Sequence, residues 1–459
     1  MPEGALARWA PPARGAEGAR FALWAAHLLT IWSIAISNVV LGVALLAELA
    51  RGRQAFAAPP RTRTATRLML AYLVLLVAAV AASEDVRWSA RALTDFFNFG
   101  TFFLALALVR GERAARWTVD TLILVATGVA ASGLFQLLFG YGELDKRIRG
   151  PFSHYMIFAG ILLVVDVLLV ARLLARRRPE TPAGGPTGLL DRGWVSWFCL
   201  AVLTTAIVGS LTRNAMVGLV AATLLVVALT RPRLLAVAPA VVIAAIVVAP
   251  VPVVARAMSI DDLSDPAVYD RLCMAEAGLR MIGERPLLGL GPNEVKRLYP
   301  LYRHPTAPRL LIPHLHDAFL ELAAERGVPE LAVYLALVAA ASLAAWRGFR
   351  RGASDADLHL GAMGALAGFL VAGLFEDNWG STSVQRVVLL LLALPFCLAP
   401  ESPALLPASG DRQLGQPARP LGEREEREEG PAVVGSPRTM ALEQREGARG
   451  IDARQLERP

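Results

Sequence analysis

The chain has 459 residues, of which 55% are hydrophobic and only 19% are charged. A water-soluble domain cannot hide so much apolar surface, because its geometry leaves a large share of residues facing solvent. Nearly uncharged runs, each long enough to cross roughly 30 Å of hydrocarbon as a helix, recur along most of the sequence. They lack the alternation that a membrane β-barrel needs. We therefore predict an all-α, polytopic helical protein embedded in a lipid bilayer.

The net charge of +7 would suggest a nucleic-acid partner in a soluble protein. Here the arginines lie between apolar runs, where they set membrane topology, so we predict no nucleic-acid partner. Cys199 and Cys397 fall inside apolar runs and Cys273 lies alone between them. This pattern predicts neither disulfides nor a zinc site, and no cofactor is expected.

The first apolar stretch, residues 21–50, is long for one helix and short for two. Ser33, Ser37 and Asn38 lie near its middle, where a helix would break. It lacks an obvious small-residue cleavage site, so we expect it to be retained. Further apolar runs that predict spans lie at residues 67–82, 96–109, 117–139, 152–171, 194–211, 214–230, 234–255, 328–346, 358–375 and 384–399.

Arginine clusters decide between one and two helices in that stretch. If it holds two, the clusters at residues 51–67, 110–116, 172–178 and 347–351 all face the cytoplasm. The loops between them then carry few cations, which is the asymmetry of known membrane proteins. We predict about twelve spans, with both termini in the cytoplasm.

This topology divides the chain into five parts. Residues 1–20 form a cytoplasmic N-terminus, and residues 21–255 hold about nine transmembrane helices. Residues 256–313 form one long periplasmic loop with short helices. Residues 314–399 begin with a helix start on that side and contain the last three spans. Residues 400–459, rich in Pro, Glu and Arg, form a disordered cytoplasmic tail, because they have few large apolar residues to bury.

Arginines on the outer side are unexpected, because membrane proteins concentrate cationic residues on the cytoplasmic side. Each such arginine therefore needs an explanation. Arg213 lies in a polar break between two apolar runs, where its fork of donors suits a phosphate or diphosphate. The alternative is an arginine that caps a membrane helix and extends to the interface. In the long loop, Arg271 and Arg280 flank an apolar pattern with helical spacing, which predicts an amphipathic helix lying on the membrane. They are too far around this helix to share a face, and it should end near Pro286.

A second polar group lies where the long loop meets the next span. His314, His316 and Asp317 are costly at the mouth of a membrane helix unless they serve a purpose. Histidines two positions apart point to different faces of a helix, so we predict no metal site. An imidazole with a carboxylate neighbour can act as a general base near neutral pH. The alternative is a set of interfacial polar residues, and this is the favoured interpretation of His154 at another outer boundary.

Three motifs, in this order, resemble the O-antigen ligase and O-antigen polymerase superfamily of bacterial membrane glycosyltransferases. Ser210–Gly218 (SLTRNAMVG) resembles the family pattern S-x-[ST]-R-[GA]. Arg271–Ile282, followed by Arg285–Asn293 (RPLLGLGPN), resembles its loop. His316-Asp317, nine residues and Gly327 resemble the ligase motif of His, a neutral polar residue, nine residues and Gly. Asp317 and Glu330 depart from the pattern. These departures leave open whether the protein is a ligase, a polymerase or a relative that uses another acceptor.

The resemblance implies metal-independent, inverting glycosyl transfer on the periplasmic side of the bacterial inner membrane. The donor would be a glycan on a polyprenyl (undecaprenyl) diphosphate, and the acceptor a sugar hydroxyl of lipid A-core or of a growing glycan. Because the leaving group is a diphosphate, we expect Arg213, Arg271 and Arg280 to neutralise its charge. His316 would take the acceptor's proton or orient its hydroxyl, with His314 as the alternate.

Two other classes of function fit a protein with about twelve spans. A secondary transporter or flippase usually places ionisable residues near the middle of the membrane. The predicted spans contain few, chiefly Asp166 and His27, with Asp120 near a span end. A scaffold that docks partners through its charged tail is the other alternative, but it gives the outer arginines no role.

Overall fold

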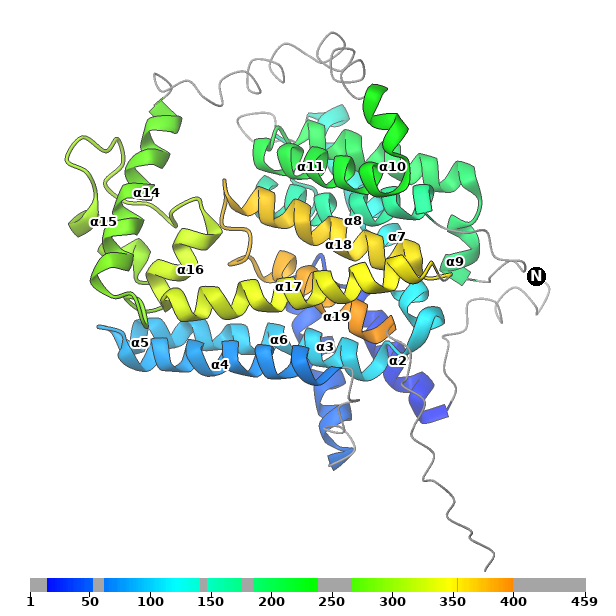
Figure 1. Cartoon of the computed structure of the whole chain (residues 1–459), viewed down its shortest axis with the longest axis horizontal. Helices are drawn as coiled ribbons and strands as arrows, with labels where there is room; N and C mark the ends of the chain where they lie inside the picture. Colours follow the sequence, from blue (N-terminus) through cyan, green and yellow to red (C-terminus); the bar gives the residue numbers. More distant parts are fainter. Residues whose placement is uncertain are drawn as a thin grey trace, which may run out of the picture. The chain divides into compact units, whose positions relative to one another are not determined.

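The computed structural model describes residues 15–52, 62–140, 147–175, 185–237, 266–352 and 354–398. Within these ranges the chain is helical and contains no strand (Figure 1). The described residues belong to one compact unit. The predicted tail, residues 400–459, lies outside the described residues. The α-helices are α2 (Gly15–Leu29), α3 (Ile34–Leu49), α4 (Arg63–Ala82), α5 (Val86–Ser89), α6 (Phe96–Leu108), α7 (Gly111–Phe139), α8 (Tyr155–Ala175), α9 (Gly185–Leu190), α10 (Gly193–Gly209), α11 (Arg213–Thr230), α14 (Pro266–Glu284), α15 (Val295–Tyr302), α16 (Ala318–Arg326), α17 (Val328–Arg351), α18 (Ala356–Gly373) and α19 (Thr382–Leu398), with 3₁₀ helices at Ala90–Asp95 and Pro232–Val237.

The helices have the composition of a membrane protein. By length and composition, six helices of the described ranges can cross a bilayer: α4, α7, α8, α11, α17 and α18. Shorter apolar helices are α3, α10 and α19. Large apolar side chains such as Val74, Leu138 and Trp194 are more than half exposed, as lipid-facing residues are. The count of about twelve spans stays a prediction, since α6 has only 13 residues and most of 234–255 lies outside the described ranges.

The stretch 21–50 forms two helices. The break between α2 and α3 falls at residues 30–33, earlier than Ser37 and Asn38, and Ser33 takes the N-cap position of α3. The two helices pack against each other, and the Ser37 hydroxyl lies 3.0 Å from Nδ1 of His27. A polar residue in the last turn of α2 and one in the first turn of α3 thereby satisfy each other.

The centre of the bundle is formed by α8 and α18, which pack against each other and against α11. Both are apolar on all sides and buried over most of their length. Two glycines bring α11 and α18 together. A Cβ on Gly218 would lie 2.5 Å from the carbonyl oxygen of Gly368, so the helices approach closely only because both positions lack side chains. This contact fixes α11, whose first residue is Arg213.

Residues 266–313 of the predicted long loop contain α14 and α15, which with α16 surround a second, smaller hydrophobic core. Helix α14 ends at Glu284, as the proline after it predicts. Its residues Met274, Ala277 and Met281 are buried in this core. The apolar face that we expected to lie on the membrane therefore packs against protein, because α15 and α16 cover it. The position of this loop on the periplasmic side stays a prediction.

The link after α14 is attached to the end of α16. The N–H groups of Leu290 and Gly291 donate to the carbonyls of Ala324 and Glu325, at 2.9 and 2.8 Å. At Gly289, φ is +67° and a Cβ would lie 2.3 Å from the backbone of Glu325, so only glycine fits. The turn at Leu288–Asn293 thus positions α16 relative to α14.

The helices contain more buried charge than the sequence suggested. Arg386, near the start of the predicted span 384–399, is 1% exposed within α19. Its guanidinium donates to Asn98 of α6 and to Ser37 and Asn38 of α3. Other arginines counted as topological markers are also buried and pair across helices. The expectation of spans nearly free of charge is wrong, because positions near helix ends face neighbouring helices rather than loops.

Candidate active site

A cavity of about 740 Å³ lies where several distant segments meet. Its lining comes from the start of α8 and of α11, the start of α14, the segment before α16, one face of α16, and the link between α18 and α19. Charged and polar side chains dominate this lining. They include Asp95, Arg147, His154, Arg213, Asp270, Arg271, Lys296, Arg309, His314, His316, Glu321, Glu325, Arg326, Glu376 and Asp377.

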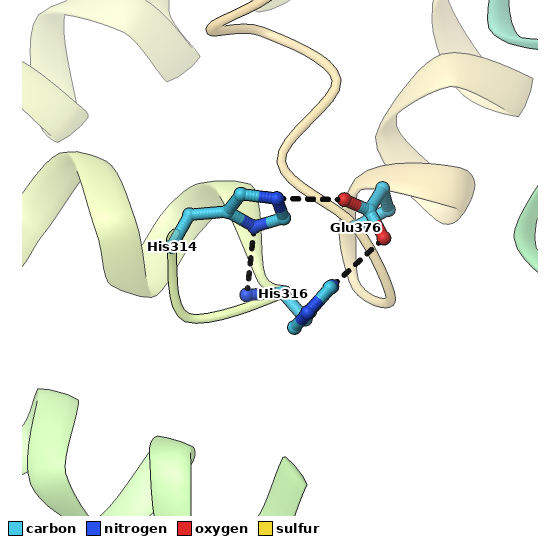
Figure 2. A group of neighbouring side chains, drawn as sticks. All are labelled: His314, His316 and Glu376. Carbon is cyan, nitrogen blue, oxygen red and sulfur yellow. Dashed lines mark hydrogen bonds and ion pairs between the residues drawn. The ribbon is translucent and has the colours of Figure 1, made fainter. Parts of the chain in front are cut away.

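Two histidines and one glutamate form the centre of the polar lining (Figure 2). His316 Nδ1 lies 2.9 Å from Oε2 of Glu376, and His314 Nε2 lies 3.2 Å from Oε1 of the same carboxylate. The two imidazole rings are 4.3 Å apart and roughly perpendicular. Glu376 is only 3% exposed, so its carboxylate is committed to the two rings rather than to water.

The hydrogen bonds of this triad determine which ring nitrogens carry protons. The backbone N–H of His316 donates to Nδ1 of His314 at 3.3 Å, so Nε2 of His314 is the protonated nitrogen that donates to Glu376. Burial lowers the pKa of His314 to about 4, which keeps this ring neutral near pH 7. In His316 the carboxylate accepts from Nδ1, which leaves Nε2 as the acceptor of that ring. No described residue hydrogen-bonds to this Nε2.

The local backbone explains why both rings face one carboxylate. We expected residues 314 and 316 to diverge, as they would on a helix, but α16 begins only at Ala318. In non-helical, extended chain, residues two positions apart share a side. Leu315 points the other way and is 2% exposed in the smaller core. The positive φ of His316 (+57°) then turns the chain into α16. The geometric reason we gave against a shared metal is therefore wrong.

One ligand atom each from His314, His316 and Glu376 lie within 4.8 Å of one another, so this group could hold a metal ion. Two imidazoles and one carboxylate are common ligands of zinc and other transition metals. The same atoms are also satisfied by hydrogen bonds among themselves. The chemical roles of the triad thus include proton handling without a metal, and an experiment with chelator separates the two.

The triad is anchored from both sides. On the histidine side, the N–H of Leu315 donates to Oε2 of Glu321 on α16 at 2.7 Å. On the glutamate side, Trp379 is buried against the rings of Tyr334 and Phe369, and its Nε1 donates to Tyr72 Oη at 2.9 Å. These contacts hold the segments that carry the histidines and Glu376 at fixed positions, as a catalytic group requires.

The two departures from the family pattern have structural roles. Asp317 caps α16, because its side chain accepts from the N–H groups of Phe319 and Leu320 at 2.9 Å. The carboxylate that contacts His316 is Glu376 instead of Asp317. Glu330, fully buried in the first turn of α17, lies 3.3 Å from the guanidinium of Arg326. Neither residue changes the triad.

The structure brings two of the three predicted diphosphate ligands to the cavity. Arg213 begins α11 after a tight link in which φ of Leu211 is +52°, and Arg271 lies near the start of α14. Arg280 lies elsewhere: it pairs with Glu276 and donates to the carbonyl of Tyr302. The helical spacing that separates it from Arg271 explains this difference.

Acidic groups occupy the α16 side of the cavity. Burial, together with the negative charge of neighbouring carboxylates, raises the pKa of Glu325 to about 7 and that of Asp377 to about 6. Burial also raises the pKa of Glu321 well above its usual range. These carboxyl groups therefore hold protons at a pH where exposed acids are ionised.

Sequence reasoning missed several lining residues. Glu376 was counted only as part of a loop with few cations, although an acidic pair between two spans is itself an indication of a site. Arg147 stacks on Tyr155 at 4.5 Å, and Arg309 pairs with Asp270 at 3.1 Å. His154, which we favoured as an interfacial residue, also lines the cavity. Their single positions carry no periodic pattern that would have singled them out.

Residues 198–335 match the family model of O-antigen ligase. This part of the chain is similar to O-antigen ligase domains. The match confirms the resemblance seen in the motifs, and it includes Arg213, Arg271 and both histidines of the triad. No curated protein matched the chain. The O-antigen ligase family implies a glycosyltransferase-like membrane enzyme of polysaccharide biosynthesis, with glycan and lipid-linked substrates. Glu376 lies outside the matched residues and joins the site only through the fold.

Proposed function

We propose that the protein transfers a glycan from a polyprenyl-diphosphate carrier to a sugar hydroxyl on the periplasmic face of the inner membrane. The observation that carries this proposal is the cavity in which the His316–Glu376 pair faces the same space as Arg213 and Arg271. A transferase of this kind needs a base for the acceptor and cations for the leaving group. Both occur here, within a domain whose family implies such chemistry.

The negative charge of the leaving group explains why the proposed site contains cations. When the bond between the anomeric carbon and the diphosphate oxygen breaks, its electron pair stays on the diphosphate. Cations preorganised at that oxygen stabilise the charge as it develops. Arg213, at the first turn of a membrane helix, and Arg271 supply guanidinium forks suited to phosphate oxygens, with Lys296 beside them. Arg280 is left out of this role, because its side chain lies away from the cavity.

Deprotonation of the acceptor hydroxyl is the role that we propose for His314, His316 and Glu376. The acceptor oxygen attacks the anomeric carbon from the face opposite the diphosphate, which inverts the configuration. Its proton passes to Nε2 of His316, while Glu376 stabilises the resulting imidazolium through the Nδ1–H bond. His314 stays neutral and orients Glu376 by its Nε2–H bond. No step requires a metal ion, so we propose a metal-independent reaction.

The acceptor that we propose is lipid A-core, which makes the protein an O-antigen ligase; a polymerase of the same superfamily is the alternative. The departures at Asp317 and Glu330 do not favour either, because both residues have structural roles outside the triad. The transporter alternative gains support from buried Arg386, which lies in a membrane helix. Against it, the cavity of about 740 Å³ that holds the proposed site lies at helix ends and in loops.

The decisive assay measures glycan transfer by purified, full-length protein from a polyprenyl-diphosphate donor, with chelator present. We expect His316→Ala to lower the rate by about 10²–10⁴-fold. Arg213→Lys keeps the charge but loses the fork, and should cost roughly 2–4 kcal/mol of transition-state stabilisation. Arg63→Ala, at an exposed position at the start of α4, is the control. Well-inserted His316→Ala and Arg213→Ala proteins that turn over like the parent would contradict the proposal and favour transport.

Labelling tests the side of the membrane on which the cavity lies. The native cysteines are buried, so a single cysteine introduced at Thr306 reports on its own position. An impermeant thiol reagent added to intact spheroplasts should modify Thr306→Cys, because this residue lies in the long loop. It should not modify Ser436→Cys in the tail. The reverse pattern would place the cavity in the cytoplasm and exclude the proposed donor side.

A further inference from the structure

A second cavity, a groove of about 290 Å³, lies between α4, α17, α18 and α19. One stripe of α17 forms its longest wall: Ala340, Leu343, Ala344, Arg347 and Arg351 recur at helical spacing. Pro395 and Phe396 of α19 close the opposite wall. The wall is therefore apolar along most of its length and cationic at one end.

This groove lies far from the catalytic cavity. Arg347 is about 28 Å along the axis of α17 from Val328, which follows the cavity residue Arg326. That distance is close to the thickness of the hydrocarbon core, roughly 30 Å. The groove thus opens at the opposite membrane boundary, which the arginine distribution predicts to be cytoplasmic.

The cationic end has donors that the protein does not use. Arg347 and Arg351 are exposed, one helical turn apart, and neither forms a hydrogen bond or ion pair with a described residue. His359, which forms part of the wall, is 1% exposed, and its Nδ1 has no hydrogen-bond partner in the described part of the chain. A buried polar atom without a partner is unfavourable, so a polar ligand or its bound water would be stabilised here.

We propose that this groove binds one anionic glycerophospholipid. Its phosphate lies between the guanidinium groups of Arg347 and Arg351, and one acyl chain lies along Leu343 and Ala344 toward Phe396. Two cations beside one phosphate favour a lipid with net negative charge over a zwitterionic one, whose own ammonium would face the arginines. A free phosphate would leave the apolar length of the groove unused. Anionic lipids are enriched where polybasic helix ends meet the cytoplasmic surface.

The test uses full-length protein, stripped of lipid and held in a neutral detergent. Thermal unfolding is followed while phosphatidylglycerol, phosphatidylcholine with the same acyl chains, or inorganic phosphate is titrated. We expect phosphatidylglycerol alone to raise the midpoint by several degrees, because a ligand that binds only the folded state stabilises it. Native mass spectrometry should show one retained phosphatidylglycerol for each protein.

Variants locate the binding. Arg347→Gln with Arg351→Gln should weaken binding by about 30-fold, which corresponds to roughly a fivefold factor for each cation. Ala344→Phe fills the apolar length and should abolish the shift. Arg350→Gln is the matched control, because Arg350 is on the same helix end but stacks on Trp346 outside the groove. Equal stabilisation by phosphatidylcholine or by free phosphate would overturn the proposal, as would an unchanged phosphatidylglycerol response in the glutamine variants. If the double variant does not fold, Arg347→Gln alone carries the same test.

Discussion

Charged residues gather in two kinds of place in this protein, and the difference separates structure from chemistry. Near the start of α7, Arg116 makes a bidentate pair with Asp357 of α18, in which both N···O distances are 2.9 Å. It also donates a hydrogen bond to Glu112. In the cavity, Arg213 and the His316–Glu376 pair line a space of about 740 Å³. The residue types are similar. A charge enclosed by a partner on another helix holds the helices together, whereas a charge that lines a cavity can also contact a bound molecule.

The largest effect is expected from breaking the enclosed pair. Arg116→Met leaves Asp357 buried without a counter-charge, which should lower the free energy of unfolding by about 3–5 kcal/mol. Arg116→Met combined with Asp357→Leu removes both charges and should recover most of that loss. Thermal unfolding in detergent measures both. Transfer activity per folded molecule should be unchanged in the double variant; a loss comparable to that of His316→Ala would show that this pair also serves chemistry.

For the cavity, the Glu376→Gln variant tests whether Glu376 positions His316. The glutamine can offer an N–H to Nδ1 of His316, which favours the wrong tautomer and leaves Nε2 protonated. We expect kcat to fall by about 10²-fold, while KM for the lipid-linked donor stays near the parent value. Glu376→Asp should recover part of the rate. Glu276→Gln, an exposed acid on α14, is the matched control. A change in KM alone would mean that Glu376 binds donor rather than positions the base.

Helix packing beneath Arg213 connects the two regions. In Gly218→Val the new side chain meets the Gly368 carbonyl, so α11 and α18 must separate. We expect this overpacking to cost about 1–3 kcal/mol of stability and to lower transfer further by displacing Arg213. Gly128→Ala on α7 is the control, since a Cβ there meets nothing within 4 Å. Equal melting temperatures for the two variants would contradict the close contact.

The smallest expected effect is a dependence of stability on pH. The pKa of Glu325 is raised by burial from 4.5 to about 7, so the folded state binds more protons than the unfolded state between these values. Stability should therefore be greatest below about pH 4.5 for this group and fall as pH rises toward 7. Glu325→Gln should flatten this part of the unfolding curve, and Glu276→Gln should leave it as in the parent. A slope that is unchanged in Glu325→Gln would assign the proton to a different group.

The sequence by itself determined the class of the protein and singled out most of the residues proposed for its site. Long uncharged runs leave helices in a bilayer as the only way to satisfy the backbone. Arg213, Arg271 and His316 were identified because charge at an outer boundary is costly without a function. The end of α14 followed from Pro286, and the turn after α14 from its glycines, since both effects are local.

Only the tertiary structure decided which of these groups meet. The faces of residues 314 and 316 depend on whether the chain there is helical, and the helix begins only at Ala318. Glu376 reaches them from 60 residues away, held by the buried ring of Trp379. Arg280 is directed away from the cavity by the turn of α14, and Arg386 is enclosed by α3 and α6. Side-chain convergence of this kind arises from helix packing, and the pattern of residues along one segment does not encode the position of another.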